Sequence, residues 1–433
     1  MLGRLEQAGY GWTFEPEGAD LVVVNTCGFL DTAREESLAV IRQMAELKQA
    51  GRLGAIIVAG CMAQRDQAAL LEACPEIDQV VGLFSRDDIA TAAIRTTGAN
   101  PPTSEAERLL LAGPLEIVQA DDCRRALLPA HIAYLKIAEG CDRRCAFCSI
   151  PSIRGRYLSK PISQIVDEAK QLADSGVREL VLIAQDTISY GRDLDDRPRL
   201  AELLRRLDEI EGLAWIRLMY LYPSPNDFDD ALLDVIASGR RIVPYLDIPL
   251  QHINDEVLRC MRRAVTREQT ETLLDRLRER IPGLTLRTTL IVGFPGETEQ
   301  QFDELVDFVR RRRFDRLGAF AYRREPGTSS DALEGHLDEA LKEARLDELM
   351  EVQQTIAFEL AREQIGRRMD VLIEHPDDDE PMAYLGRAPC DAPEIDGVVY
   401  VTGENLQPGQ IVPCEIVSAQ EYDLIGVAID QPK

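Results

Sequence analysis

The ten residues EGCDRRCAFC at positions 139–148 decide how this chain is interpreted, because they place three cysteines on one short loop. Cys141, Cys145 and Cys148 are separated by three and then two residues, and the loop follows a β-rich stretch at 134–138. A structural zinc site uses four ligands in two separated pairs, and no matching fourth ligand lies nearby. Cysteine thiolates are the usual ligands of iron–sulfur clusters. The loop therefore predicts a cluster held by three thiolates.

Strand and helix patterns alternate on the carboxyl side of this loop, up to about residue 322. Six strand–helix units whose consecutive strands are neighbours predict a partial (βα)6 barrel. The loop would then follow the first barrel strand, at the end of the barrel where catalytic sites form. The six candidate strands are 134–138, 179–184, 215–220, 244–248, 285–292 and 317–322.

Three thiolates leave one iron of a 4Fe–4S cluster without a protein ligand. An open iron of this kind is what the amino and carboxylate groups of S-adenosylmethionine chelate. The spacing and position of the loop thus predict a cluster that binds and reductively cleaves this cofactor. Five further cysteines stand alone in ordinary contexts and are expected to be packed or surface residues; they are Cys74, Cys123, Cys260, Cys390 and Cys414.

The first domain, expected at 1–100, shows two β-rich runs that each end beside a cysteine. The run at 21–24 leads to Cys27, and the run at 54–59 leads to Cys61. Buried strands alternating with helices predict a parallel α/β sheet, whose ligand site lies at the carboxyl ends of its strands. We therefore expect the two thiols at the same edge of the sheet.

The remaining segments complete the predicted domain organisation. Residues 101–126 lack a clear period and are interpreted as a linker, and 127–364 form the core that ends in a long charged helix. Short strands with glycine turns follow at 367–433 and predict a small β-barrel of the oligonucleotide-binding type. Four strands are expected there: 369–373, 398–401, 411–417 and 424–428.

Charge restricts the partners of the chain. The sequence carries 49 Lys and Arg against 75 Asp and Glu, a net charge of −26, which repels phosphate backbones. Between 369 and 433 there are 14 acidic residues against Arg387 and Lys433, a net of −12. No apolar run has the length of a membrane span and the start lacks a secretory signal, so a cytoplasmic location is expected.

The cysteine triplet and the barrel behind it resemble the radical S-adenosylmethionine superfamily. The stretches Asn25-Thr26-Cys27 and Gly60-Cys61 resemble the methylthiotransferases within it, and the terminal barrel resembles their TRAM domain. The resemblance covers nearly the whole chain. It implies an enzyme with two 4Fe–4S clusters and S-adenosylmethionine as cofactors.

The second cluster implied by the resemblance is an auxiliary one in the first domain, held by three cysteines. Cys27 and Cys61 match the second and third of these ligands. In the family the first ligand precedes a helix like that at 1–7. The first strand and the first ligand are missing from this sequence, so either its start was assigned too late, which we expect, or the auxiliary site is incomplete.

Two further stretches resemble the branch of the family that modifies a ribosomal protein, namely 150–155 and 392–400. The resemblance implies that a methylthio group is added to the β-carbon of an aspartate in a basic small-subunit ribosomal protein. The acidic terminal barrel favours such a partner and disfavours direct tRNA binding. Two alternatives stay open: a methylthiotransferase for adenosine in tRNA, and a non-catalytic iron–sulfur protein that recruits ribosomal components. The electron donor does not follow from the sequence.

The resemblance also implies residues of the S-adenosylmethionine pocket. Gln185 and Asp186 end the second barrel strand, where the family contacts the methionine part of the cofactor. Gly293 and Glu297 lie in a turn at 291–297 that lines the adenosyl part.

Three other residues near these positions have two interpretations each. His252, at the end of the fourth strand, is either structural or in contact with substrate. Arg154 and Arg156 follow the cluster loop and either meet the cofactor carboxylate or belong to an ordinary surface loop.

Overall fold

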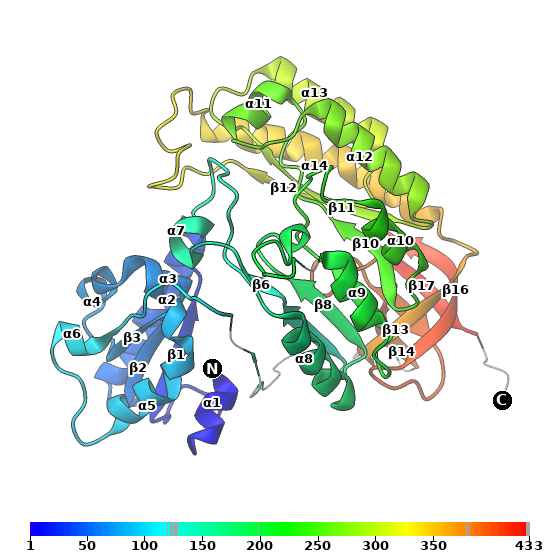
Figure 1. The fold of residues 1–433 in the computed structure, drawn as a ribbon. Helices are drawn as coiled ribbons and strands as arrows, with labels where there is room; N and C mark the ends of the chain where they lie inside the picture. The colour runs from blue at the N-terminus through cyan, green and yellow to red at the C-terminus, as the bar shows by residue number, and fades with distance from the viewer. Residues whose placement is uncertain are drawn as a thin grey trace. The chain divides into compact units, whose positions relative to one another are not determined.

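The computed structural model describes residues 1–118, 120–121, 124, 129–197, 199–377, 380 and 382–429. Cys123 and parts of the predicted linker lie outside the described residues. The chain forms two compact units, each assembled from segments that are separate in the sequence (Figure 1). The first unit comprises Met1–Arg125, Glu139–Leu158 and Glu325–Asp331. The second comprises Ala126–Ala138, Ser159–Arg324 and Ala332–Lys433.

A parallel sheet in the order β1-β2-β3-β4 forms the centre of the first unit. Its middle strand β2 is apolar and buried along nearly its whole length, as expected for a parallel strand covered on both faces. The short β4 lies within the predicted linker and pairs with β3. The strands are β1 (Leu21–Thr26), β2 (Ala55–Gly60), β3 (Gln79–Gly82) and β4 (Leu109–Leu110).

Helices and one two-stranded ribbon complete the first unit. The longest helix, α2, carries an apolar stripe that packs on the sheet, whereas α6 is short and begins with a capping box between Ser104 and Glu107. Strands β6 (Ala138–Glu139) and β7 (Leu158–Ser159) pair with each other. The helices are α1 (Leu2–Gln7), α2 (Asp31–Gln49), α3 (Cys61–Asp66), α4 (Ala68–Ala73), η1 (Leu83–Asp88), α5 (Ile89–Thr97), α6 (Glu105–Arg108) and α7 (Ile150–Arg154).

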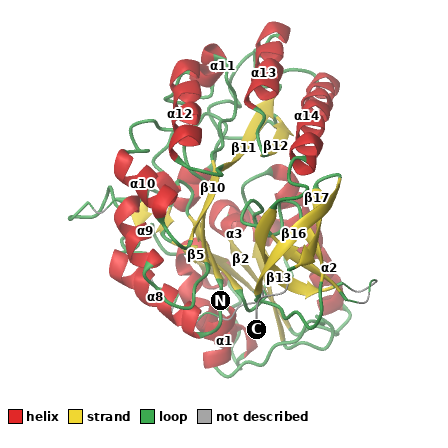
Figure 2. Ribbon diagram, turned by 90° about the vertical axis from the view of Figure 1, so that its right-hand side faces the viewer, coloured by secondary structure: helices red, strands yellow, loops and turns green. Residues whose placement is uncertain are grey.

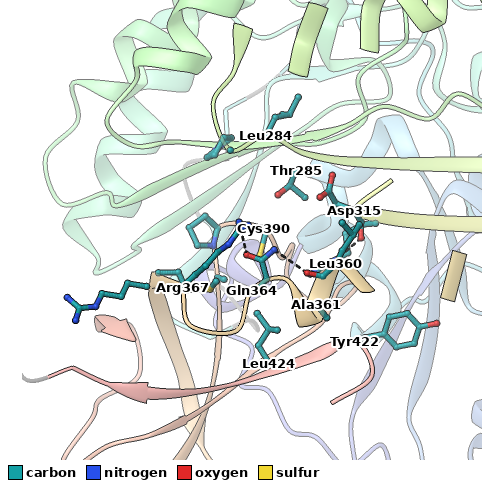
Figure 3. A pocket seen from close by; sticks show the side chains of 17 residues that line it. Leu284, Thr285, Asp315, Leu360, Ala361, Gln364, Arg367, Cys390, Tyr422 and Leu424 are labelled. Carbon is teal, nitrogen blue, oxygen red and sulfur yellow. Dashed lines mark hydrogen bonds between the residues drawn. The ribbon is translucent and has the colours of Figure 1, made fainter. Parts of the chain in front are cut away.

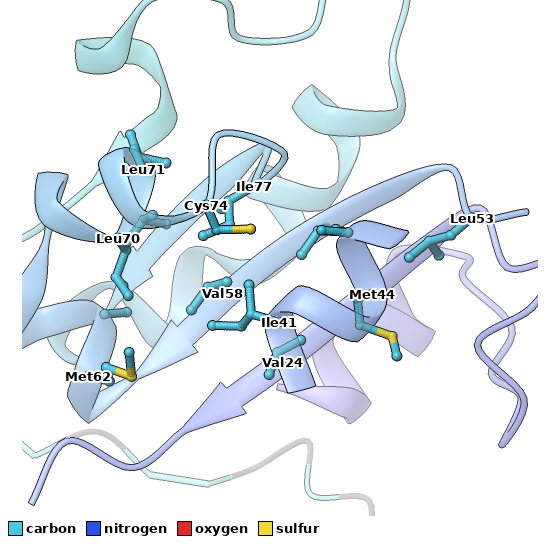
Figure 4. Close-up of a cluster of buried hydrophobic side chains, with 14 residues drawn as sticks. Val24, Ile41, Met44, Leu53, Val58, Met62, Leu70, Leu71, Cys74 and Ile77 are labelled. Carbon is cyan, nitrogen blue, oxygen red and sulfur yellow. The ribbon is translucent and has the colours of Figure 1, made fainter. Parts of the chain in front are cut away.

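The main hydrophobic core of the first unit lies between α2 and the sheet (Figure 4). Ile41 of α2 and Val58 of β2 are fully buried, and Met44 and Val24 pack beside them. Burial of each such side chain stabilises the fold by about 1.5–3 kcal/mol relative to exposure. Cys74 is 3% exposed and belongs to this core.

Six parallel strands form the main sheet of the second unit, in the order β12-β11-β10-β9-β8-β5. Strands that follow each other in sequence are neighbours, so the predicted (βα)6 arrangement is confirmed. The sheet is open, with β5 and β12 at its two edges. The strands are β5 (Ile132–Lys136), β8 (Glu179–Ile183), β9 (Trp215–Leu218), β10 (Ile242–Asp247), β11 (Thr285–Val292) and β12 (Arg316–Ala321).

Helices cover the outside of this sheet, and Figure 2 shows α9, α10 and α12 beside one another. Threonines 266 and 298 form capping boxes that start α12 and α13. No helix in the described part of the chain is long and apolar enough to cross a membrane. The helices are α8 (Ile162–Asp174), η2 (Thr187–Ser189), α9 (Leu200–Asp208), α10 (Asp230–Ser238), α11 (Asp255–Cys260), α12 (Arg267–Arg280), α13 (Glu299–Arg312) and α14 (Glu339–Arg362).

The carboxyl-terminal strands close into a small barrel in the order β13-β14-β15-β17-β16, which confirms the predicted fold class. One strand, β14, was not among the four expected from the sequence. It is short, contains Gly386, and ends in a fully buried arginine, so the usual alternation of apolar and polar residues is absent. The strands are β13 (Arg368–Pro376), β14 (Ala383–Arg387), β15 (Val399–Thr402), β16 (Ile411–Gln420) and β17 (Asp423–Ala428).

A cavity of about 350 Å³ lies between the end of α14, the terminal barrel and the six-stranded sheet (Figure 3). Its walls include Leu360 of α14, Leu424 of β17 and Thr285, the first residue of β11. Because Thr285 starts its strand, the cavity is at the amino ends of the strands. Barrel sites form at the opposite, carboxyl ends, so this cavity is not the candidate site.

A buried ion-pair network joins the terminal barrel to the six-stranded sheet. Glu179 of β8 accepts hydrogen bonds from Arg217 of β9 at 2.7 Å and from Arg387 of β14 at 2.5 Å. The three side chains are at most 2% exposed. Burial opposes ionisation of Glu179, but the two arginines outweigh it and hold the pKa of this carboxyl below its usual value.

The loop between β14 and β15 extends this network. Arg217 also donates to the backbone oxygen of Pro389 at 2.8 Å, and Arg316 of β12 pairs with Asp391. The hydroxyl of Tyr245 donates to Asp396 at 2.7 Å. The loop therefore brings acidic side chains to the arginines and tyrosine of the sheet.

Substitution Glu179→Gln leaves Arg217 with no carboxylate in the network and Arg387 with only Glu374. We expect this change to lower the free energy of unfolding by about 3–5 kcal/mol, the cost of breaking a buried ion pair. Urea unfolding followed by fluorescence of Trp215 in a Trp12→Phe background measures it, because Trp215 lies on β9 beside the network.

The matched control is Glu202→Gln, which breaks an exposed pair with Arg205. Exposed pairs contribute about 0–1 kcal/mol, so this variant should unfold close to the parent. Equal effects of the two substitutions would contradict a special role for the buried network.

Candidate functional site

The cysteine loop runs from the end of β6 to α7 and is held by backbone hydrogen bonds of the first unit. The amide of Cys141 donates to Gly155 O at 3.2 Å, and the amide of Cys148 donates to Cys145 O at 3.2 Å. Cys141 is 8% exposed, and Cys145 and Cys148 are half-buried. The amide of Ser330, far along the chain, donates to Ala146 O at 2.9 Å. The triplet is thus presented on a loop anchored at both ends.

Gly140 is required by the geometry of this loop. Its φ is +77°, and a Cβ atom there would lie 2.1 Å from the backbone oxygen of Arg156. The Cβ atom of any other residue would clash with the backbone of Arg156. That segment cannot move without displacing Cys141, whose amide is bonded to Gly155 O. The glycine before the first cysteine therefore allows two backbone segments to touch.

Cys27 and Cys61 lie at the same edge of the first sheet, as predicted from the strand ends. Thr26 of β1 and Gly60 of β2 are register partners, and each is followed directly by its cysteine. A Cβ atom on Gly28 would lie 2.7 Å from the amide nitrogen of Met62, so the turn after Cys27 contacts the backbone that carries Cys61. Cys27 is exposed and Cys61 is half-buried.

Arg154 connects Cys61 with the start of the cysteine loop. This last residue of α7 donates from Nη2 to Cys61 Sγ at 3.1 Å and from Nη1 to Glu139 Oε1 at 2.5 Å. Burial raises the pKa of the Cys61 thiol, and the positive charge of Arg154 works against that rise. From the sequence, Arg154 was expected either to meet the cofactor carboxylate or to belong to a surface loop. Neither expectation included a contact with a cysteine. Arg156 is exposed, with its Nε 3.8 Å from Asp142.

In the second unit, buried polar side chains lie just after the carboxyl ends of β8 and β10. Oε1 of Gln185, after β8, and Oε1 of Gln251, after β10, are buried atoms with no hydrogen-bond partner among the described residues. Gln251 also has a φ of +72°, held by backbone bonds to Thr289 and Ile291. Asp186 is 2% exposed and accepts from Ser189 at 2.6 Å. Gln251 was not among the pocket residues expected from the sequence, although its position after a strand could have indicated it.

The turn after β11 is held by the carboxylate of Glu297, one of its own residues. The Glu297 carboxylate accepts from the amide of Gly293 at 3.0 Å and from Arg345 of α14 at 2.8 Å. His252 Nε2 lies 3.4 Å from the same carboxylate, and both side chains are fully buried. Glu297 and His252 therefore shape the end of the sheet, and the turn they hold carries Gly293.

The donor set of the cysteine loop fits an iron–sulfur cluster. Three thiols at this spacing suit iron, and the loop is partly shielded from water. Among the described residues no three Cys, His, Asp or Glu side chains yet converge as metal ligands. The orphaned amide oxygens at the strand ends fit a cofactor rich in hydrogen-bond donors.

Comparison with known proteins matches three family models along the chain. The "Uncharacterized protein family UPF0004" model matches residues 1–82, the "Radical SAM superfamily" model 135–309, and the "TRAM domain" model 365–429.

Curated relatives are similar over nearly the full chain. "Ribosomal protein uS12 methylthiotransferase RimO" of Clostridioides difficile (strain 630) is 45% identical, over 98% of this chain and 94% of the relative. The protein of the same name from Syntrophus aciditrophicus (strain SB) is 44% identical, over 100% of this chain and 95% of the relative.

Solved structures share the fold at low identity. The radical S-adenosylmethionine methyltransferase TsrM from Kitasatospora setae, with cobalamin and a [4Fe-4S] cluster bound, has a TM-score of 0.53 and 19% identity. The match covers 85% of this chain and 71% of that one.

Substitution Gly140→Ala should remove most of the iron held by the cysteine loop, because the added methyl group meets the Arg156 backbone. Iron is measured after anaerobic reconstitution in a Cys27→Ala/Cys61→Ala background, so that only the loop binds it. The control is Gly176→Ala, which has a φ of +101° but nothing within 4 Å of its Cβ position. Iron binding by Gly140→Ala equal to that of the control would contradict the requirement.

Substitution Gln251→Leu removes an orphaned acceptor with little change in volume. We expect the affinity for S-adenosylmethionine to fall about tenfold, near 1.4 kcal/mol, the usual range for one hydrogen bond. Anaerobic calorimetry on the reconstituted protein measures it. Gln353→Leu is the control, because its Oε1 is also orphaned but its Nε2 binds Phe314 O at the amino end of β12. A change of similar size in both variants would refute a contact with the cofactor.

Proposed function

Because this chain belongs to the family of ribosomal protein uS12 methylthiotransferases, we propose that it adds a methylthio group to the β-carbon of an aspartate in that protein by radical S-adenosylmethionine chemistry. The observation that carries the proposal is the anchored loop with Cys141, Cys145 and Cys148 within a chain that matches these relatives from end to end.

The cofactors are two 4Fe–4S clusters and S-adenosylmethionine. When bound, they supply the electron, the 5′-deoxyadenosyl radical that removes a hydrogen atom, and the sulfur and methyl group of the product. Cys141, Cys145 and Cys148 are the proposed ligands of the cluster that binds S-adenosylmethionine. Cys27 and Cys61 are the proposed ligands of the auxiliary cluster.

The residues at the strand ends of the second unit bind and orient the cofactor in this proposal. Gln185, Asp186 and Gln251 offer acceptors to its amino and hydroxyl groups. Gly293 presents backbone at a turn whose shape is set by Glu297. Burial of these groups also keeps water from a reactive radical.

The acidic terminal barrel supports a basic protein as substrate. Its net charge of −12 over 369–433 attracts a basic ribosomal protein and repels the phosphates of tRNA. The same charge argues against the alternative of a tRNA adenosine methylthiotransferase. A ribosomal substrate also supports action in the cytoplasm.

Substitution Cys145→Ala tests the radical chemistry. It should abolish formation of 5′-deoxyadenosine from S-adenosylmethionine by the reduced, reconstituted protein, because two thiolates do not hold the cluster. Cys260→Ala, at an exposed cysteine on α11, should behave like the parent. Turnover by the Cys145→Ala protein would refute the assignment, and a parent that binds iron without any turnover would support the non-catalytic alternative.

The substrate is tested by separate incubations with purified uS12 and with tRNA, each followed by mass spectrometry. We expect a methylthio mass gain on one aspartate of uS12 and none on tRNA. A gain on tRNA alone would assign the chain to the other branch of the family.

A further inference from the structure

The segment that carries the cysteine loop is basic, although the chain as a whole is strongly acidic. Residues 139–156 hold four arginines against two acidic residues, a local net charge of +2, whereas the whole chain has a net charge of −26. One of the four, Arg154, pairs with the buried Glu139. We call the other three the arginine patch: Arg143, Arg144 and Arg156.

A cavity of about 580 Å³ brings the arginine patch together with the first cysteine of the loop. All three arginines and Cys141 line this cavity, and all four residues belong to the first unit. Cys145 and Cys148 are not part of its wall. The cavity therefore adjoins the cysteine loop without being the space that a cluster between the three thiols would fill.

Backbone hydrogen bonds hold Arg156 beside Cys141. The amide of Cys141 donates to Gly155 O at 3.2 Å, and the amide of Tyr157 donates to Asp142 Oδ1 at 3.2 Å. The two bonds flank Arg156 and tie its segment to the start of the loop. The arginine patch is thus part of the same structure that presents the first cysteine.

Asp142 supplies the one carboxylate among the residues that line the cavity, and it leaves the patch basic. It lies 3.8 Å from Arg156 Nε, and the two side chains are 59% and 91% exposed. An ion pair exposed to this degree is weak, so it holds neither side chain against a competing partner. Arg144 is exposed as well. An acidic surface can therefore approach the patch at little cost.

The sign of the patch indicates a partner other than the substrate. A basic ribosomal protein is repelled by three arginines, whereas the acidic terminal barrel attracts it. The proposed chemistry needs one more reactant, an electron for the cluster at the cysteine loop. An acidic protein that carries single electrons would be attracted to the patch and would meet the loop at Cys141. Partners in electron transfer form small and weak interfaces, which an exposed patch of this size suits.

We propose that the arginine patch is the docking surface for an acidic one-electron carrier protein that reduces the cluster held by Cys141, Cys145 and Cys148. This inference rests on the proposed function, because it needs that cluster. One electron leaves the carrier, which is oxidised, and enters the cluster, which is reduced. No bond forms or breaks, and no proton is transferred. Attraction between patch and carrier raises the rate of encounter and weakens as salt is added.

The first measurement is binding of a carrier to the reconstituted full chain under anaerobic conditions. The probes are a purified flavodoxin of low isoelectric point and an acidic ferredoxin, each labelled with a fluorophore and titrated at an ionic strength of about 10 mM, where charges act over about 30 Å. The patch variant, Arg144→Glu/Arg156→Glu, is expected to raise the Kd at least tenfold. The Kd of the parent should also rise toward 0.15 M salt, where this distance falls to about 8 Å.

The matched control makes the same change in net charge elsewhere in the first unit. Arg42 of α2 and Arg95 of α5 are exposed arginines outside the cysteine loop. Arg42→Glu/Arg95→Glu should bind the carrier like the parent. Because the whole chain is acidic, this control separates the effect of the patch from general repulsion.

The second measurement is the rate at which the cluster is reduced, followed by stopped-flow absorbance. Reduced flavodoxin should reduce the patch variant at least tenfold more slowly than the parent. Dithionite, a small reductant that needs no docking, should reduce both at nearly the same rate. Formation of 5′-deoxyadenosine with dithionite tests the proposed function independently of the carrier.

Parental binding and reduction of the patch variant, or equal weakening in the control, overturns the inference. Absence of binding of either carrier to the parent also overturns it. If the patch variant loses its iron, Arg144→Gln/Arg156→Gln decides: a raised Kd supports the inference and a parental one overturns it. Weaker binding of uS12 or tRNA by the patch variant, with carrier binding unchanged, assigns the patch to that partner instead. A parent that forms no 5′-deoxyadenosine with dithionite contradicts the proposed function, whether or not the carrier binds.

Discussion

The buried carboxylate of Glu179, held between Arg217 and Arg387, is the interaction on which the second unit depends. A charge without contact to water is tolerated only when opposite charges and hydrogen bonds replace the lost hydration. Glu179 begins β8, Arg217 lies on the neighbouring β9, and Arg387 comes from a strand about 200 residues later. An open parallel sheet and a closed barrel of mixed strand directions therefore share one buried ion-pair network. The apolar contacts around it, from Trp215 and Tyr245 to Leu372 and Ala392, exclude water from the network.

Much of the fold was predictable because its strands are short apolar runs with clear ends. The segments expected at 285–292 and 215–220 correspond to β11 and β9 within two residues. The family and the fold class were confirmed. Strand β14 was missed because its pattern is broken by Gly386 and by Arg387, a buried charge that pairs with Glu179 on a distant strand and with Glu374 on the neighbouring one. A charged residue is normally predicted to be exposed, and its burial can be predicted only when its partner is known.

Part of the candidate site was likewise predictable from the sequence, and part of it was not. Spacing along the chain makes Cys141, Cys145 and Cys148 the proposed cluster ligands, and two strand ends predicted that Cys27 and Cys61 lie at one edge of the sheet. No spacing could indicate that Arg154 contacts Cys61, because 93 residues separate them and the contact depends on how α7 packs on α3. The roles of Gln251 and Glu297 likewise depend on which neighbours satisfy their polar atoms. Local chemistry was visible in the sequence, whereas the partners of each group required the structure.

The loop between β14 and β15 has a consequence for how such chains diversify. Here three charged residues of the barrel segment, Arg387, Asp391 and Asp396, pair with Glu179, Arg316 and Arg287 of the six-stranded sheet. A recombined chain whose barrel lacks them would leave Glu179 with Arg217 alone in the network and would deprive Arg316 of the carboxylate of Asp391. The residues on the two sides of this contact can therefore change only together, so the sheet and the barrel are inherited as one unit.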